Sequence, residues 1–399
     1  MDNFIYSNPV KMLYGKRQSD NIAKEILPYG KNILFVYGEK HLKATGMYDK
    51  ITKQLKDAGI EYTDLGKIHI NPRLSSVQEG IKICKEKKID FILAVGGGSV
   101  SDAAKAIGVG AKVDYDIWMA YEDFHNIMLG NQGDFPHVPT ETIPTGIVMT
   151  KPGTGSDFDY TSVLTNTETK EKLMIINKTL YPKFSILDPE LTYTLQRNES
   201  MYGTADIMTH IMEQYFTPTE NVDALDGFKE SHLRNVIKSG KDVIANSHDY
   251  NAQSNLLYIA SWACSDQNMT GTSGGWESHL IEHELTAATD LNHGHGMAIV
   301  YLGWMRYTIE YIPQKFRKFA ENVWNVDTTG LTDIEAGMQG IEKTAQYWQS
   351  LGISLSLESV GIGEDVIKHA AKRAARFGNI GTVKKLDEQD VYNILKSVS

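Results

Sequence analysis

The segment from Asp90 to Lys105 constrains the fold of this 399-residue chain more than any other. Residues 90–95 read Asp-Phe-Ile-Leu-Ala-Val, a nearly continuous apolar run typical of a strand that is buried on both faces. Three glycines, Gly96 to Gly98, follow this run, and a helical pattern comes after them. A buried strand that passes through a tight turn into a helix indicates a βα unit of a parallel sheet.

The same alternation recurs through the first half of the chain. Strand-like and helix-like runs follow one another at residues 32–37, 48–58, 60–63 and 75–85. Repeated βα units of this kind predict a doubly wound parallel sheet with helices on both faces. A more irregular β-rich stretch follows from about residue 142 and ends in a strand-like run at 184–187.

The pattern changes after Asp188, where long amphipathic helical segments replace the βα units. A chain of this length is too long for one ordinary core, so two domains are expected. We predict a dinucleotide-binding α/β domain at residues 1–190 and an all-helical, metal-binding domain at residues 191–399.

Composition excludes several classes of function. The formal net charge of −10 gives no basic footprint for nucleic acid. No apolar stretch reaches the roughly 18 residues that a membrane-spanning helix needs, and the N-terminus carries no secretory signal pattern. Two cysteines give no disulfide framework, which favours a cytoplasmic location.

The glycine turn after residue 95 is suited to binding phosphate. Glycines allow a close approach of the backbone, and the N-terminus of the following helix offers free N–H groups to an anion. A tight βα turn without a ligand is the alternative. Upstream, Glu39 follows another predicted strand, where a carboxylate can accept hydrogen bonds from an adenosine ribose; it could also be a surface residue beside Lys40.

Four residues farther along the chain have the chemistry of a metal site. Asp206 and His210 are four residues apart, which places both on one face of a helix. His279 and His293 complete a set of one carboxylate and three imidazoles, which suits Fe²⁺ or Zn²⁺. Gly294 and Gly296 next to this set indicate a close approach of the backbone near the site.

A competing motif overlaps the same segment. His279-Leu-Ile-Glu282-His283 matches H-x-x-E-H, the inverted zinc-protease signature, in which both histidines bind zinc and Glu282 is the base. This five-residue pattern leaves Asp206, His210 and the glycine turn unexplained.

Together, the motifs resemble those of iron-dependent (group III) alcohol dehydrogenases, closest to the butanol-dehydrogenase-like branch. The resemblance covers essentially the whole chain. It rests on the glycine motif through Lys105, Thr154-Gly155-Ser156, Leu187-Asp188-Pro189, Gly203-x-x-Asp206-x-x-x-His210-x-x-Glu213, and His279-x-x-x-His283 with His293-Gly294.

This resemblance implies a dehydroquinate synthase-like fold, with a Rossmann-like α/β N-terminal domain, an all-α C-terminal domain and an active site in the cleft between them. A lyase of the dehydroquinate-synthase type shares the fold and a metal, but the motif set fits it less well. By position, the metal ligands are Asp206, His210, His279 and His293. His283 is implied beside the nicotinamide and substrate, as a catalytic proton relay.

The implied cofactor contacts lie in the first domain. NAD(H) is favoured over NADP(H), because Glu39 falls where NAD-preferring relatives carry an acidic residue. The residues expected at the cofactor are Glu39, Asn71, Gly97, Gly98, Ser99, Asp102, Thr150, Thr154 and Lys172. The enzyme is expected to interconvert a short-chain aldehyde and its primary alcohol, and to form a homodimer or larger homo-oligomer.

Two residues depart from the family pattern. Relatives usually carry an apolar residue at Lys151 and often Asn at Asp159, so the pocket could be more polar than a butanol site. One hypothesis is an anionic aldehyde, such as sulfoacetaldehyde or succinic semialdehyde, with Lys151 as counter-charge. The alternative is that Lys151 pairs with Asp159 or Asp157 and never meets the substrate.

Overall fold

The computed structural model describes residues 1–38, 41–376 and 378–399. It divides into two compact units, one of residues 8–195 and the other of residues 196–399 together with residues 1–7. The sequence had placed this boundary at residue 190. In the described part of the chain, no helix has the length and hydropathy of a membrane-spanning segment.

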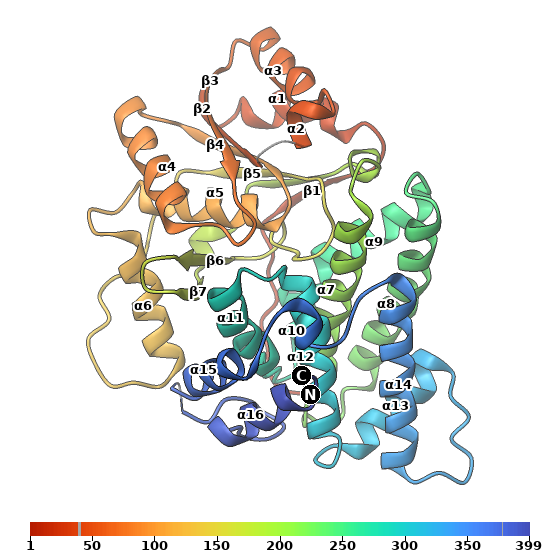
Figure 1. Cartoon of the computed structure of the whole chain (residues 1–399). Coiled ribbons are helices and arrows are strands. Elements are labelled where there is room, and N and C mark those ends of the chain that lie inside the picture. The colour runs from red at the N-terminus through yellow and green to blue at the C-terminus, as the bar shows by residue number, and fades with distance from the viewer. Residues whose placement is uncertain (39–40, 377) are drawn as a thin grey trace. The chain divides into compact units, whose positions relative to one another are not determined.

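In the described residues of the first unit, six parallel strands form one sheet, in the order β1-β8-β5-β4-β2-β3 (Figure 1). The strands are β1 (Lys11–Tyr14), β2 (Asn32–Gly38), β3 (Glu61–Ile68), β4 (Phe91–Gly96), β5 (Thr145–Met149) and β8 (Phe184–Leu187). An antiparallel hairpin consists of β6 (Thr161–Asn166) and β7 (Glu171–Ile176). The helices are α1 (Ile22–Ile26), α2 (His41–Ala44), α3 (Met47–Asp57), α4 (Leu74–Lys87), α5 (Gly98–Gly110) and α6 (Ile117–Met128).

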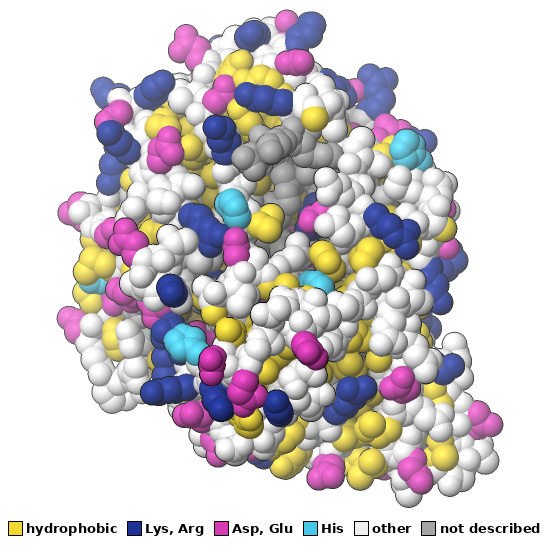
Figure 2. Space-filling model, in the orientation of Figure 1, with side chains coloured by type: hydrophobic (Ala, Val, Ile, Leu, Met, Phe, Trp, Pro, Cys, Tyr) yellow, Lys and Arg dark blue, Asp and Glu magenta, His cyan; other side chains and the backbone are white. Residues whose placement is uncertain are grey.

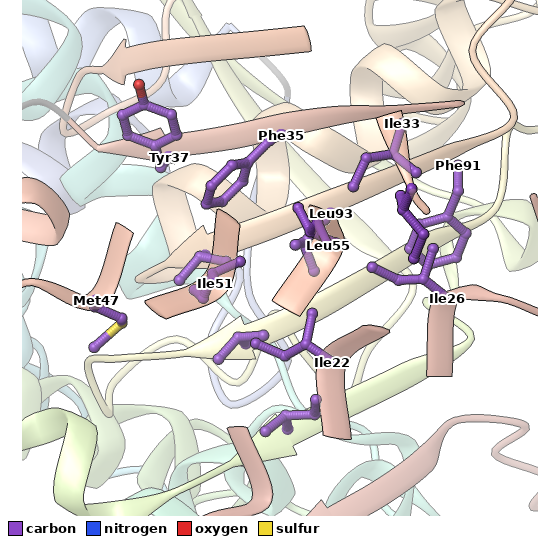
Figure 3. Packing of buried hydrophobic residues seen from close by; sticks show 14 of the residues in the cluster. Ile22, Ile26, Ile33, Phe35, Tyr37, Met47, Ile51, Leu55, Phe91 and Leu93 are labelled. Atoms are coloured by element: carbon purple, nitrogen blue, oxygen red, sulfur yellow. The ribbon is translucent and has the colours of Figure 1, made fainter. Parts of the chain in front are cut away.

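Helices cover both faces of this sheet, as the βα alternation predicts. In β2, Ile33, Phe35 and Tyr37 face one side and pack in a buried cluster with side chains of α1 and α3 (Figure 3). Leu34 and Val36 are also buried and point to the opposite side. There α4 packs on β2, and α5 packs on β4 and β5. Burial on both faces explains why β2 and β4 are apolar at nearly every position.

The second unit is helical, which confirms the predicted fold class. Its helices are α7 (Arg197–Tyr215), α8 (Asp223–Ala245), α9 (Tyr250–Ala263), α10 (Asp266–Met269), α11 (Glu277–Thr289), α12 (His293–Thr308), α13 (Pro313–Trp324), α14 (Asp333–Leu351), α15 (Glu364–Ala375) and α16 (Glu388–Lys396). The central helix α7 packs against α8, α9 and α12, and α11 packs against α12 and α15.

On the face of the molecule seen in Figure 2, basic and acidic side chains are interspersed. Acidic residues outnumber basic ones in the whole sequence, which gives the formal net charge of −10.

Candidate functional site

The helical unit brings together the four residues that the sequence marks as a metal-binding set. Asp206 and His210 lie one turn apart on α7, His279 lies on α11, and His293 is the first residue of α12. One donor atom from each of the four lies within 4.8 Å of the others. Three of the side chains are buried, and His293 is partly exposed.

Buried carboxylates fix the orientation of two of these histidines. Nδ1 of His279 lies 2.9 Å from Oε1 of Glu213 on α7. Nδ1 of His293 lies 2.6 Å from Oε2 of Glu282 on α11. A carboxylate on Nδ1 favours the tautomer that carries its proton there, and leaves Nε2 with its lone pair for a metal.

The set also passes a test of fit for a divalent cation. Asp206 Oδ1 is buried without a hydrogen-bond partner among the described residues, and it lies 3.5 Å from Nε2 of His293 and 3.9 Å from Nε2 of His210. Around the histidines, the buried carboxylates of Asp206, Glu213 and Glu282 are each at most 4% exposed. A buried carboxylate oxygen aimed at imidazole nitrogens is costly unless a cation joins them, so these residues fit a metal ion.

The buried negative charge is visible in the pKa values near this set. Burial raises the pKa of Glu213 to about 7, and the hydrogen bond from Ser278 partly offsets the effect. Burial and repulsion by Glu213 raise the pKa of Glu277 to about 8. A divalent ion would favour the ionised form of these carboxylates.

The geometry does not support the inverted zinc-protease motif. Among the described residues, no metal-binding group contains both His279 and His283. Glu282, the base in that interpretation, is wholly buried and contacts His293 and Thr286. Its carboxylate is thus committed to His293 and Thr286, which does not suit the base of that motif.

His283 lies one turn beyond His279 on α11 and is buried. The centre of its ring is 5.7 Å from that of His293. His283 therefore adjoins the four-residue metal-binding set through His293, and it also forms a second possible metal-holding group with Glu282 and His293.

The glycines beside His293 have the predicted close contacts. A Cβ on Gly294 would lie 2.3 Å from the carbonyl oxygen of Tyr202 on α7, and one on Gly296 would lie 2.7 Å from Oε1 of Glu282. The intervening His295 stacks on the ring of Tyr202, with the ring centres 4.7 Å apart. Gly294 therefore lets α12 start close to α7, and Gly296 lets it lie close to Glu282 of α11, which helps to position His293.

In the α/β unit, the glycine turn leads directly from β4 into α5. Gly97 caps the helix, and Gly98 and Ser99 form its first residues. A Cβ on Gly98 would lie only 2.2 Å from Oγ1 of Thr154. Gly98 is therefore required for contact between the turn and the loop after β5.

Two further predicted cofactor residues connect the same loop to the sheet and to α5. Thr150 is buried, and its backbone N–H donates to the carbonyl of Gly96 at 2.9 Å. The Asp102 carboxylate accepts hydrogen bonds from Ser156 Oγ at 2.5 Å and from the backbone N–H of Val163 at 3.1 Å. Burial raises the pKa of Asp102 to about 6. Asp102 thus holds α5 against this loop.

Asn71 and Lys172 also lie together, with the Lys172 ammonium donating to Oδ1 of Asn71 at 3.4 Å. Both residues are buried, and Asn71 has a left-handed backbone with φ of 53°. The predicted ribose contact of Glu39, and its neighbour Lys40, lie outside the described residues.

The two residues that depart from the family pattern have different surroundings. Asp159 is buried and forms an ion pair with the wholly buried Lys105, at 2.6 Å. Asp157 accepts a hydrogen bond from Ser185 at 2.6 Å. The Lys151 side chain lies along the glycine turn, where a Cβ on Gly97 would be 3.4 Å from its Cβ and 3.5 Å from its Cδ.

The orienting roles of Glu213 and Glu282, and the place of Trp276 beside the site, were not predicted from the sequence. The Trp276 ring lies 4.9 Å from the ring of His279 between centres, and its backbone is left-handed with φ of 55°. The spacing of the glutamates was available as a signal: Glu213 follows His210, and Glu282 follows His279, by three residues, which places each pair on one helix face.

Comparison with known proteins matches both units to one family. Residues 9–189 match the iron-containing alcohol dehydrogenases, and residues 200–399 match the C-terminal part of the Fe-containing alcohol dehydrogenase family. Among curated proteins, the chain is 39% identical over 397 residues to "Probable NADH-dependent butanol dehydrogenase 1" of Bacillus subtilis, with both chains covered completely. It is 38% identical to NADH-dependent butanol dehydrogenase A of Clostridium acetobutylicum, over 99% of each chain.

A solved structure extends this similarity to three dimensions. The crystal structure of NADH-dependent butanol dehydrogenase A from Thermotoga maritima superposes with a TM-score of 0.93 at 33% sequence identity, and it covers 100% of this chain and 99% of its own. These matches confirm the resemblance inferred from the motifs. The chain belongs to the iron-containing alcohol dehydrogenase family and is an oxidoreductase of the alcohol dehydrogenase or aldehyde reductase type.

Proposed function

We propose that this enzyme uses NADH to reduce a short-chain aldehyde to its primary alcohol, and catalyses the reverse reaction, at a divalent ion bound by Asp206, His210, His279 and His293. The observation that carries the proposal is the convergence of four donor atoms within 4.8 Å, with Asp206 Oδ1 buried among imidazole nitrogens. Fe²⁺ and Zn²⁺ both suit this donor set.

When bound, such an ion supplies Lewis-acid stabilisation of the negative charge that develops on a carbonyl oxygen. The protein residues prepare for this charge. Glu213 and Glu282 keep Nδ1 of their histidines engaged, so both Nε2 atoms are presented in a fixed direction. His283 is proposed to donate a proton to the alkoxide oxygen during reduction and to accept it during oxidation.

The cofactor is proposed to bind to the α/β unit. Gly97, Gly98 and Ser99 would hold its pyrophosphate at the start of α5, with Asp102 fixing α5 in place. The other proposed cofactor contacts are Glu39, Asn71, Thr150, Thr154 and Lys172. A preference for NADH over NADPH is supported by an acidic residue at position 39 and by the names of the butanol dehydrogenases to which the chain is similar.

The proposal does not extend to anionic aldehydes. Asp159 is buried in its ion pair with Lys105, so it is assigned to packing and not to the substrate pocket. The methylenes of Lys151 lie against the glycine turn, which favours a role toward the cofactor. An uncharged short-chain aldehyde such as butanal is therefore the proposed substrate class.

NADH oxidation by metal-depleted protein, reloaded anaerobically with Fe²⁺ or Zn²⁺, tests this function. We expect activity with butanal to appear only after reloading and to be stronger with NADH than with NADPH. His279→Gln should abolish this activity, whereas His369→Gln, which removes an exposed histidine of α15, should not. Absence of NADH oxidation with every aldehyde tried, after loading with either metal, would refute the proposal.

A further inference from the structure

We propose that Lys151 binds the pyrophosphate of the nicotinamide cofactor and is a specific feature of the cofactor site in this chain. This inference rests on the proposed function, because it requires a dinucleotide at the glycine turn. It differs from the hypothesis drawn from the sequence, in which the same ammonium meets an anionic substrate.

The register of the sheet places Lys151 beside the glycine turn. Strands β4 and β5 are parallel neighbours, and Gly96 pairs with Met149. The ladder continues one residue farther, because the backbone N–H of Thr150 donates to the carbonyl of Gly96 at 2.9 Å. Lys151 therefore leaves the carboxyl edge of the sheet next to Gly97, the residue that caps α5.

From there, the Lys151 side chain lies along the glycine turn. A Cβ added to Gly97 would lie 3.4 Å from Cβ, 3.5 Å from Cδ and 3.9 Å from Cγ of Lys151, all within van der Waals contact. Three successive positions along one lysine side chain thus lie against the backbone proposed to hold the pyrophosphate. Lys151 is only partly buried, which suits a lysine whose methylene stem is packed against the turn.

Charge makes phosphate the appropriate partner. The turn itself offers only backbone N–H groups and the partial positive charge of a helix N-terminus. A lysine at this edge adds a full positive charge and can form a charge-assisted hydrogen bond with a phosphate oxygen. An ammonium engaged in this way is not available as counter-charge for a substrate.

Binding of ADP-ribose tests this role, because ADP-ribose contains the pyrophosphate but lacks the nicotinamide and needs no aldehyde. Calorimetric titration of the full chain with ADP-ribose and with NADH should show affinities about tenfold lower for both in Lys151→Met, the loss expected for one charge-assisted contact at a partly exposed site. The salt dependence of binding should also weaken. Lys151→Arg should retain most of the affinity, because it keeps the charge.

Lys183→Met is the matched control. Lys183 is exposed and directly precedes β8, so it lies at the amino ends of the parallel strands, whereas Lys151 lies at their carboxyl ends. Its loss should therefore leave both affinities unchanged. Wild-type affinity for ADP-ribose in Lys151→Met would overturn the inference, as would a change confined to the preference between charged and uncharged aldehydes. If Lys151→Met does not fold, unchanged binding in Lys151→Gln would overturn it equally. Failure of the wild type to bind NADH would instead refute the proposed function.

Discussion

Replacing Glu213 by Gln should weaken metal binding without unfolding the protein. Glu213 is 1% exposed. Its Oε1 accepts hydrogen bonds from the Ser278 hydroxyl and from the backbone N–H of His279 at 3.3 Å, and it lies 2.9 Å from Nδ1 of the same histidine. Glutamine keeps the volume and one acceptor oxygen but removes the negative charge. The substitution therefore tests whether charge on Glu213 makes His279 a better ligand.

The expected magnitude follows from which of these contacts change when metal binds. The bonds from Ser278 and the backbone are present with and without metal, so their contributions largely cancel. The Nδ1 contact becomes stronger on metal binding, because the ring then donates charge through Nε2. Hydrogen bonds to charged groups contribute about 1 to 1.5 kcal/mol more than neutral ones. The metal dissociation constant should therefore rise about 10-fold, the lower end of the range for such carboxylates.

Competition for Zn²⁺ with a chromogenic chelator measures this affinity directly. Glu230→Gln is a suitable control, because Glu230 is also buried and hydrogen-bonded, to Tyr215 and Asn322, but belongs to neither metal-holding group found among the described residues. The metal-free Glu213→Gln protein should be at least as stable to heat as the wild type, since Glu213 and Glu277 repel one another. An unchanged zinc affinity, or a weaker affinity accompanied by a large loss of metal-free stability, would refute the positioning role.

Three further predictions concern the two units separately. Burial lowers the pKa of His232 from 6.5 to about 4, so the folded protein keeps this histidine neutral where the unfolded chain already binds a proton. The wild type should therefore lose up to about 3 kcal/mol of stability as pH falls from 6.5 to 4. Urea titrations should find this loss absent in His232→Phe. Lys105→Met should lower the free energy of unfolding by about 3 to 5 kcal/mol in the same assay, because it leaves the buried charge of Asp159 without its lysine. The double variant Lys105→Met/Asp159→Leu should recover most of that loss, and no recovery would contradict this reasoning. Gly98→Ala should lower the melting temperature, because its Cβ would lie 2.2 Å from a threonine oxygen, whereas Gly97→Ala, with its nearest contact at 3.4 Å, should melt as the wild type does.

The sequence predicted the strands whose burial leaves a local signal. The apolar runs at 32–37 and 184–187 correspond to β2 and β8, because a strand buried on both faces must be apolar at nearly every position. Strand β1, at residues 11–14, was not predicted. It is four residues long, lies at the edge of the sheet and is only partly buried, so neither alternation nor a long apolar run marks it. Its pairing with β8, far along the chain, could not be read from either segment alone.

Helical spacing identified the first two residues of the metal-binding set for a related reason. A spacing of four residues fixes Asp206 and His210 on one face of α7 whatever the rest of the fold does. The same rule places Glu213 on that face, but it cannot say which group the carboxylate meets. Glu213 contacts His279 on a different helix, and this contact depends on how the helices pack.

Each of the two orienting carboxylates contacts a histidine on a different helix, so neither contact can be predicted from one segment of the sequence. Glu213 on α7 orients His279 on α11, and Glu282 on α11 orients His293 on α12. Each carboxylate therefore serves a histidine on the next helix of the site, so the ligand directions depend on helix packing as well as on local spacing. Gly294 contributes to the same packing, since any side chain there would meet the backbone of α7. A substitution that shifts α12 should thus weaken metal binding even though it leaves all four ligands and both glutamates in place.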